Sequence, residues 1–309
     1  MNITQAIVFM ICGLALCSCE APPSQFSAKS TLAVNEVRGR VLDVDVNTSM
    51  VKVEILACGK ELQKEWGGVS GFEQFFAVQP GDLNLLNLKS VFRASTRKTF
   101  TPARGPGFLL SCVWPDDRSE RIRVNNVNRL LRRDTLSMGD SMIRSVGDTL
   151  PPFALYDQDG EVLTTDYFDG SVTVLNFIFT RCSIAEMCPA STMRMKKLQT
   201  LAKLTKVPHV KFLSITLDPE FDTPGVLKSY ARAYDLNEQN FRLGTATKAA
   251  IDDLNRQFGI FRKNIEDLPL DHTMRTMIIN SKRQIIYQFP GSHWSAEDFL
   301  ARLPEGVEG

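Results

Sequence analysis

A hydrophobic segment that leads directly into two cysteines constrains this chain more than any other feature. Residues Val172–Thr180 are mostly β-branched, aliphatic or aromatic, which is typical of a strand covered on both faces of a sheet. Cys182 and Cys188 follow, and Pro189 marks the start of a helix, because proline is favoured at the first helical position. The segment therefore predicts a strand, a turn that carries two cysteines, and a helix.

The predicted helix would place Cys188 at the positive end of a helix dipole. Such a position stabilises a thiolate, so we expect a lowered pKa for the Cys188 thiol. Thiolates attack disulfides and bind soft metal ions such as Cu(I). The pair Cys182 and Cys188 therefore predicts redox chemistry or capture of a soft ion. The alternative is a plain stabilising disulfide, although closing so short a loop on a rigid turn adds little stability.

The start of the chain predicts export and attachment to a membrane. Residues Ala6–Leu16 are apolar apart from one glycine, and this run is shorter than the roughly 20 residues that a membrane span requires. We interpret residues 1–19 as a lipoprotein signal peptide with its lipidation site, because Leu16–Cys19 resembles a bacterial lipobox whose acylated residue is Cys19. The segment Met1–Gln5 departs from a typical signal peptide by lacking Lys and Arg. The alternative is an uncleaved N-terminal anchor.

Residues 20–33 are polar and contain proline, which is typical of a flexible tether. Both interpretations of the N-terminus place the folded part outside the cytoplasm. We therefore expect a protein of the bacterial cell envelope that faces the periplasm and is held by a lipid anchor.

The charges of the chain almost cancel. There are 36 basic and 35 acidic residues, so no overall field attracts nucleic acid, and small ions or proteins are the expected partners. An arginine-rich stretch between Arg118 and Arg133 is interpreted as a solvated helix face, and the alternative is a site for an anionic partner.

The chain contains seven cysteines. Two of them would leave with the signal peptide and Cys19 would be acylated. An even number then remains outside the cytoplasm, which permits disulfides within each domain. Cys58 and Cys112 are the predicted structural disulfide of the first domain, and the alternative is a pair of buried free thiols.

Residues 34–145 predict a small all-β, OB-like barrel that ends in a helical linker. Short runs of alternating hydrophobic residues are separated by turn residues, and closing them into a barrel removes exposed edges. The segment Val124–Arg133 has the apolar spacing of a helix, and Asp134 is expected to end it.

Residues 146–309 predict an α/β domain with thioredoxin-like architecture. A second buried strand, Val210–Leu217, follows the first helix, and Thr223 and Pro224 cap the next helix. A hairpin and a final helix then complete the order strand, helix, strand, helix, hairpin and helix.

This second domain resembles the Sco/SenC family of copper chaperones and thiol-disulfide proteins. Three motifs across roughly half the chain carry the resemblance: Phe-Thr-Arg-Cys182 leading to Cys188-Pro, the stretch Ser214–Pro224, and Asp271-His272-Thr. In that family two cysteines and one histidine bind copper and pass it toward the binuclear copper centre of a respiratory oxidase.

The resemblance implies that Cys182, Cys188 and His272 bind copper, as Cu(I) or Cu(II), and that Asp218 lies beside the metal ligands. The alternative for Asp218 is a loop cap. The family's cysteines are usually three residues apart, whereas five residues separate them here. The turn must therefore bulge, with Met187 either packing the bulge or acting as an extra soft ligand.

The first domain contains Val37-Arg-Gly-Arg-Val-Leu-Asp-Val-Asp45 and Gln79-Pro-Gly-Asp-Leu83, and with these stretches it resembles the CusF-like copper-binding barrels. Those barrels hold Cu(I) with methionines and a histidine beside a tryptophan, but residues 56–95 contain Trp66 and neither Met nor His. We therefore interpret this barrel as a degenerate structural or docking module.

The sequence thus predicts a membrane-anchored copper-binding protein that assists copper insertion into a respiratory cytochrome oxidase. Its expected partner is the copper-centre subunit of that oxidase or another copper protein. The alternative is a thiol-disulfide oxidoreductase that uses Cys182 and Cys188 as a redox pair to reduce cysteines of a partner protein. A third hypothesis is a tethered scaffold whose thiols are only structural.

Overall fold

The computed structural model describes residues 32–67, 70–101, 104–139, 141–263 and 271–306 of the chain. The predicted signal peptide, the lipidation site Cys19 and nearly all of the tether lie outside these residues. Within them, no helix combines the length and the apolar character needed to cross a membrane.

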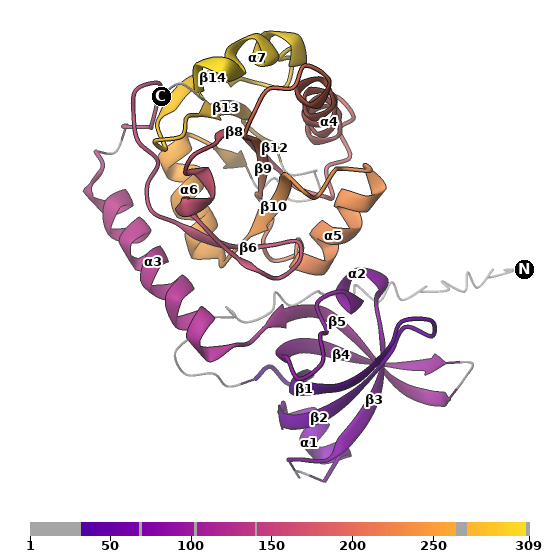
Figure 1. Ribbon diagram of the computed structural model, residues 1–309. Coiled ribbons are helices and arrows are strands. Elements are labelled where there is room, and N and C mark those ends of the chain that lie inside the picture. The colour runs from indigo at the N-terminus through magenta and orange to yellow at the C-terminus, as the bar shows by residue number, and fades with distance from the viewer. Residues whose placement is uncertain (1–31, 68–69, 102–103, 140, 264–270, 307–309) are drawn as a thin grey trace, which may run out of the picture.

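The first part of the chain forms the predicted OB-like barrel (Figure 1). Five strands close in the order β1-β2-β3-β5-β4, with β3 parallel to β5 and the other described pairs antiparallel. Hydrophobic residues that alternate along the strands, such as Val53 and Ile55, fill its interior. The elements are β1 Glu36–Asp45, β2 Met50–Cys58, α1 Lys60–Glu65, β3 Glu73–Val78, α2 Pro80–Leu83, β4 Val91–Thr101 and β5 Gly105–Pro115.

The predicted disulfide between Cys58 and Cys112 is not formed. Neither residue is in a disulfide; Cys58 is buried and Cys112 is half-buried. Cys58 ends β2 and Cys112 lies in β5, and these strands are not neighbours in the barrel. Because adjacent strands are about 4.8 Å apart, residues on non-neighbouring strands seldom come within the roughly 7 Å between Cα atoms that a disulfide requires.

A long helix, α3 Arg118–Ser137, leaves the barrel and packs against the second part of the chain. The carboxylate of Asp117 caps it by accepting hydrogen bonds from the backbone N–H groups of Ser119 and Glu120. The prediction that Asp134 ends the helix is wrong. The Asp134 carboxylate instead accepts hydrogen bonds from Arg144 and Gln257. Its side chain therefore has partners while its backbone stays in the helix.

The second part forms a seven-stranded sheet with the order β14-β13-β8-β9-β10-β6-β7, and it has the predicted thioredoxin-like architecture. Strand β8 lies inside the sheet between β13 and β9, and every one of its residues is buried. The elements are β6 Ala154–Asp157, β7 Val162–Thr164, the 3-10 turn Thr165–Phe168, β8 Val172–Ile178, α4 Cys188–Leu204, β9 Val210–Thr216, α5 Pro224–Ala233, β10 Phe241–Thr245, α6 Lys248–Phe258, β11 Arg262–Lys263, β12 Asp271–His272, β13 Arg275–Ile279, β14 Ile285–Pro290, α7 Ala296–Arg302 and the 3-10 turn Leu303–Gly306.

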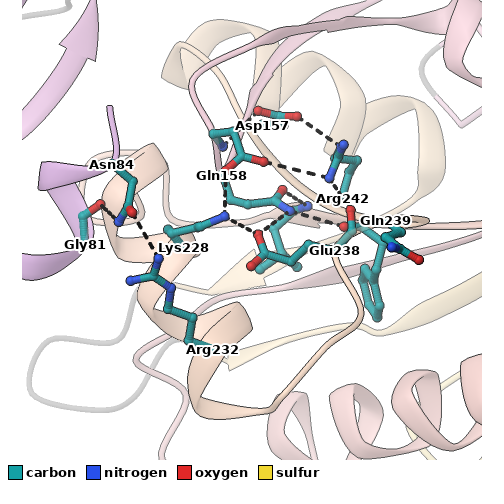
Figure 2. Close-up of polar contacts among 12 residues, drawn as sticks. Gly81, Asn84, Asp157, Gln158, Lys228, Arg232, Glu238, Gln239 and Arg242 are labelled. Carbon is teal, nitrogen blue, oxygen red and sulfur yellow. Dashed lines mark hydrogen bonds and ion pairs between the residues drawn. The ribbon is translucent and has the colours of Figure 1, made fainter. Parts of the chain in front are cut away.

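The barrel packs against the sheet-containing part through α2 and β5, which both contact α5 (Figure 1). Figure 2 shows one polar contact of this interface, in which the Arg232 guanidinium on α5 donates to the side-chain oxygen of Asn84 at 3.0 Å. The two parts therefore meet through a direct interface in addition to the connection through α3.

Candidate metal and redox site

The two cysteines of the sequence motif lie where β8 gives way to α4. The loop between them is organised by backbone hydrogen bonds: the Cys182 N–H donates to the Phe179 carbonyl at 3.3 Å, and the Met187 N–H donates to the Ile184 carbonyl at 3.0 Å. These turns accommodate the longer spacing and bring the two side chains into contact. The Cys188 thiol donates a hydrogen bond to the Cys182 sulfur, and neither cysteine is in a disulfide.

The surroundings shift the pKa values of the two thiols in opposite directions. The hydrogen bond from the Cys188 thiol lowers the pKa of Cys182 to about 6, with help from backbone hydrogen bonds of Cys188 and Ile184 and against the effect of burial. The pKa of Cys188 is raised, first because its thiol is the donor and second because it is completely buried.

The prediction of a lowered pKa for Cys188 is therefore wrong. Cys188 does begin α4, as expected. However, its own backbone N–H at the helix N-terminus is directed to the sulfur of Cys182. The start of the helix thus stabilises the thiolate of Cys182.

A buried carboxylate that sequence reasoning missed, Asp222, joins the ends of β8 and β9. It is 0% exposed and accepts hydrogen bonds from the Thr180 N–H at 3.1 Å, from the Thr180 hydroxyl, and from the Thr216 hydroxyl at 2.6 Å. Burial raises the pKa of Asp222 to about 6 despite these bonds. Its charge in turn contributes to the raised pKa of Cys188. In the sequence Asp222 precedes a Thr-Pro pair and is easily mistaken for part of a helix cap.

Asp218, the predicted neighbour of the metal, lies in the loop after β9. Its carboxylate pairs with the Arg181 guanidinium at 2.5 Å, and that guanidinium also covers the Phe221 ring at 4.2 Å from its centroid. The Asp218 N–H donates to the Thr216 hydroxyl. Asp218 is thus held beside the residue that precedes Cys182, and a role next to a bound metal stays a prediction.

His272 lies in β12, where it pairs with Arg262 of β11. Its side chain is outside the described part of the structure. Strand β13 follows and runs antiparallel to β8, with Thr276 opposite Asn176. The chain therefore enters β13 at the end of the sheet where β8 leads to the cysteines, which brings the segment with His272 to the same edge.

The described side chains contain no group of three or more His, Cys, Asp or Glu residues that could hold a metal ion. Met187 is half-buried and packs against the hydrophobic core of the sheet. Two adjacent sulfur donors are present, and they match the preference of Cu(I) for thiolates.

Comparison with known proteins identifies the family. The family model SCO1/SenC matches residues 142–308. This chain belongs to the Sco/SenC family, which is related to copper-binding cytochrome oxidase assembly proteins. The matched range includes Cys182, Cys188, Asp218 and His272.

Relatives resemble the second part of the chain at low identity. The SCO2-like protein RP587 of Rickettsia prowazekii is 27% identical over 144 residues, which cover 45% of this chain and 67% of that protein. The SCO1 protein homolog of Bacillus subtilis is 36% identical over 90 residues, 29% of this chain and 45% of that protein. A solved SCO1/SenC family lipoprotein from Bacillus anthracis is 25% identical, with 53% of this chain and 99% of that chain covered and a TM-score of 0.49.

Proposed function

We propose that this chain is a membrane-anchored copper-binding protein that assists copper insertion into a respiratory cytochrome oxidase. The observation that carries the proposal is the contact between the thiols of Cys182 and Cys188 at the turn before α4. Copper is the cargo of this reaction. Membership of the Sco/SenC family supports the assignment.

The chain's own residues suit the capture of Cu(I). Cys182, with a pKa of about 6, supplies a thiolate at neutral pH. Cys188 keeps its proton until an ion competes for the sulfur, since burial and the hydrogen bond to Cys182 raise its pKa. Because metal ligands must be deprotonated, loading the site releases that proton. His272 would supply the third ligand, as the family motif implies.

The proposed location rests on the N-terminal sequence. We propose that Cys19 is acylated, that residues 20–33 tether the folded part, and that the protein faces the periplasm. The proposed partner is the subunit that holds the copper centre of the oxidase, or another copper protein. A lipid anchor would hold the protein at a membrane surface of the cell envelope.

An anaerobic Cu(I) titration against a competing chelator tests the proposal. The reduced chain is expected to bind one Cu(I), and Cys182→Ser, Cys188→Ser and His272→Ala are each expected to lose it. Cys112→Ser is the matched control, because this thiol is not in a disulfide and lies in the barrel, so its loss should leave binding unchanged.

Oxidation provides a second arm of the same test. A disulfide between Cys182 and Cys188 removes both anionic donors, so the oxidised chain is expected to bind no copper tightly. Retention of copper by the oxidised chain or by both cysteine variants would contradict the proposed ligands.

A thiol-disulfide oxidoreductase is the second candidate, and the low pKa of Cys182 favours it. The Cys182 thiolate would attack a disulfide of a partner protein, forming a mixed disulfide and releasing one partner thiolate. The Cys188 sulfur, after losing its proton, would then attack Cys182 and release the second partner thiolate. The partner disulfide is reduced by two electrons and the cysteine pair is oxidised by two. Rapid exchange without copper binding would favour this function over the first.

A further inference from the structure

The interface between the barrel and the sheet-containing part is unusually close at two glycines. A Cβ atom at Gly81 of α2 would lie 2.1 Å from the carbonyl oxygen of Gly225 in α5, and one at Gly225 would lie 2.1 Å from the carboxylate of Asp82. Only glycine therefore fits at either position. The contact places Asp82, which is 3% exposed, between the barrel and the first turn of α5.

The backbone of β5 forms two hydrogen bonds with the Asp82 carboxylate. The Val113 N–H donates to it at 3.4 Å, and the backbone of Cys112 forms a second hydrogen bond with it. Cys112 has a φ of 53°, and it lies where the pairing of β4 with β5 is irregular. This left-handed residue turns two successive N–H groups toward one carboxyl group, an arrangement that binds acceptors.

The charged groups on the elements packed against Asp82 have other partners. On α5, the Lys228 ammonium lies 2.6 Å from both Asp159 and Glu238, and the Arg232 guanidinium reaches Asn84 (Figure 2). The remaining titratable groups on these elements are the hydroxyl of Tyr230, which bonds to Thr192, and the half-buried thiol of Cys112.

Among the described residues, none of these cations forms an ion pair with Asp82. An ionised carboxylate at this place lacks a compensating cation, and it is far less favourable there than in water. Burial raises the pKa of Asp82 to about 7, although the hydrogen bonds from the backbones of Val113 and Cys112 favour the ionised form.

We propose that Asp82 is a pH-sensitive latch between the barrel and the sheet-containing part. The neutral carboxyl holds α2 against α5, and its ionisation weakens the contact. Helix α5 begins directly after Asp222 and Thr223. Release of its first turn would therefore disturb the hydrogen bonds by which the Asp222 carboxylate joins β8 and β9 at the cysteine site. The inference does not depend on copper binding.

The direction of the effect follows from linkage. An exposed aspartate in the open state has its ordinary pKa of 3.8, whereas the closed state holds it at about 7. The contact is therefore strongest below about pH 4. It weakens by up to about tenfold per pH unit to about pH 7, at most roughly a thousandfold in all, and is constant at higher pH.

Hydrogen exchange of the full chain between pH 4 and pH 8, corrected for the intrinsic rate at each pH, measures the opening. The reporters are the amide of Leu85, bonded to the Asp82 carbonyl, and the amide of Leu227 in the first turn of α5. Their protection factors are expected to fall steadily to about pH 7 and then level off. Amides of β8 are expected to keep their protection.

Asp82→Asn should give protection factors that do not change with pH, because the amide stays neutral. Asp253→Asn is the matched control: this carboxyl is also buried but pairs with Arg132 at 2.6 Å, away from α2. The protection factors of Asp253→Asn should still fall with rising pH, as in the wild type. If Asp82→Asn fails to fold, a ¹³C NMR titration of the wild-type Asp82 carboxyl measures its midpoint directly, which is expected near pH 7. A flat wild-type profile, a slope that persists in Asp82→Asn, or a midpoint near 4 would overturn the latch.

Discussion

Replacing Cys188 with alanine should make Cys182 a much weaker nucleophile at neutral pH, although the replaced group is not the one that reacts. The thiol of Cys188 is the largest cause of the lowered pKa of Cys182, which falls from 9.0 to about 6. At pH 7 a thiol with a pKa of about 6 is roughly nine-tenths ionised, whereas one with a pKa of 9 is about 1% ionised.

The expected change follows from these fractions. Removing the Cys188 thiol deletes the largest cause of the lowered pKa, so the pKa of Cys182 should rise from about 6 toward its ordinary value of 9.0. Each unit by which that pKa exceeds 7 lowers the thiolate fraction at pH 7 by roughly tenfold. Cys188→Ser, whose hydroxyl can still donate, should keep part of the shift.

The assay is the rate of alkylation by iodoacetamide from pH 4 to pH 10, with the modified Cys182 peptide quantified by mass spectrometry. Site-specific detection is needed because Cys58 and Cys112 are also thiols outside any disulfide. Cys58→Ala serves as the control and should leave the profile unchanged. A midpoint that stays near 6 in Cys188→Ala would show that the hydrogen bond is not the cause, and a wild-type midpoint near 9 would refute the described environment.

Three further predictions concern stability and processing. Phe177→Ala should lower the free energy of unfolding by about 3–5 kcal/mol in urea denaturation, because this ring in β8 is completely buried and packs on Phe258, whereas the exposed Leu204→Ala should change it by less than about 0.5 kcal/mol. Asp117→Ala should cost about 0.5–2 kcal/mol in the same experiment by removing the cap of α3, and an unchanged midpoint would argue against that cap. Mass spectrometry of the mature N-terminus should find a diacylglyceryl group on Cys19, and an intact Met1 would contradict it.

Much of the fold could be predicted from local patterns. The run that begins at Val172 is a buried strand because both faces of a central strand are covered, and the proline after Cys188 marks the helix start. The alternation of valines and isoleucines likewise identified the barrel strands. These features depend on residues that are close in sequence.

Features that depend on tertiary context could not be predicted. Asp134 looked like a helix stop, but its partners Arg144 and Gln257 become visible only when α3 and α6 pack together. Which cysteine carries the lowered pKa depends on the direction of one hydrogen bond. The contact of Gly81 with Gly225 joins residues 144 positions apart, and the turn pattern Pro80-Gly81-Asp82 does not indicate that the two glycines meet.

The central claim is that Cys182 and Cys188 hold copper together, and X-ray absorption spectroscopy of the Cu(I)-loaded chain tests it most directly. The account predicts two sulfur scatterers per copper and one nitrogen scatterer from His272. Cys182→Ser is expected to lose tight Cu(I) binding and should therefore not give the two-sulfur spectrum, whereas Cys112→Ser should leave the spectrum unchanged. A copper shell composed only of nitrogen and oxygen, or one that is identical in wild type and Cys182→Ser, would contradict the account.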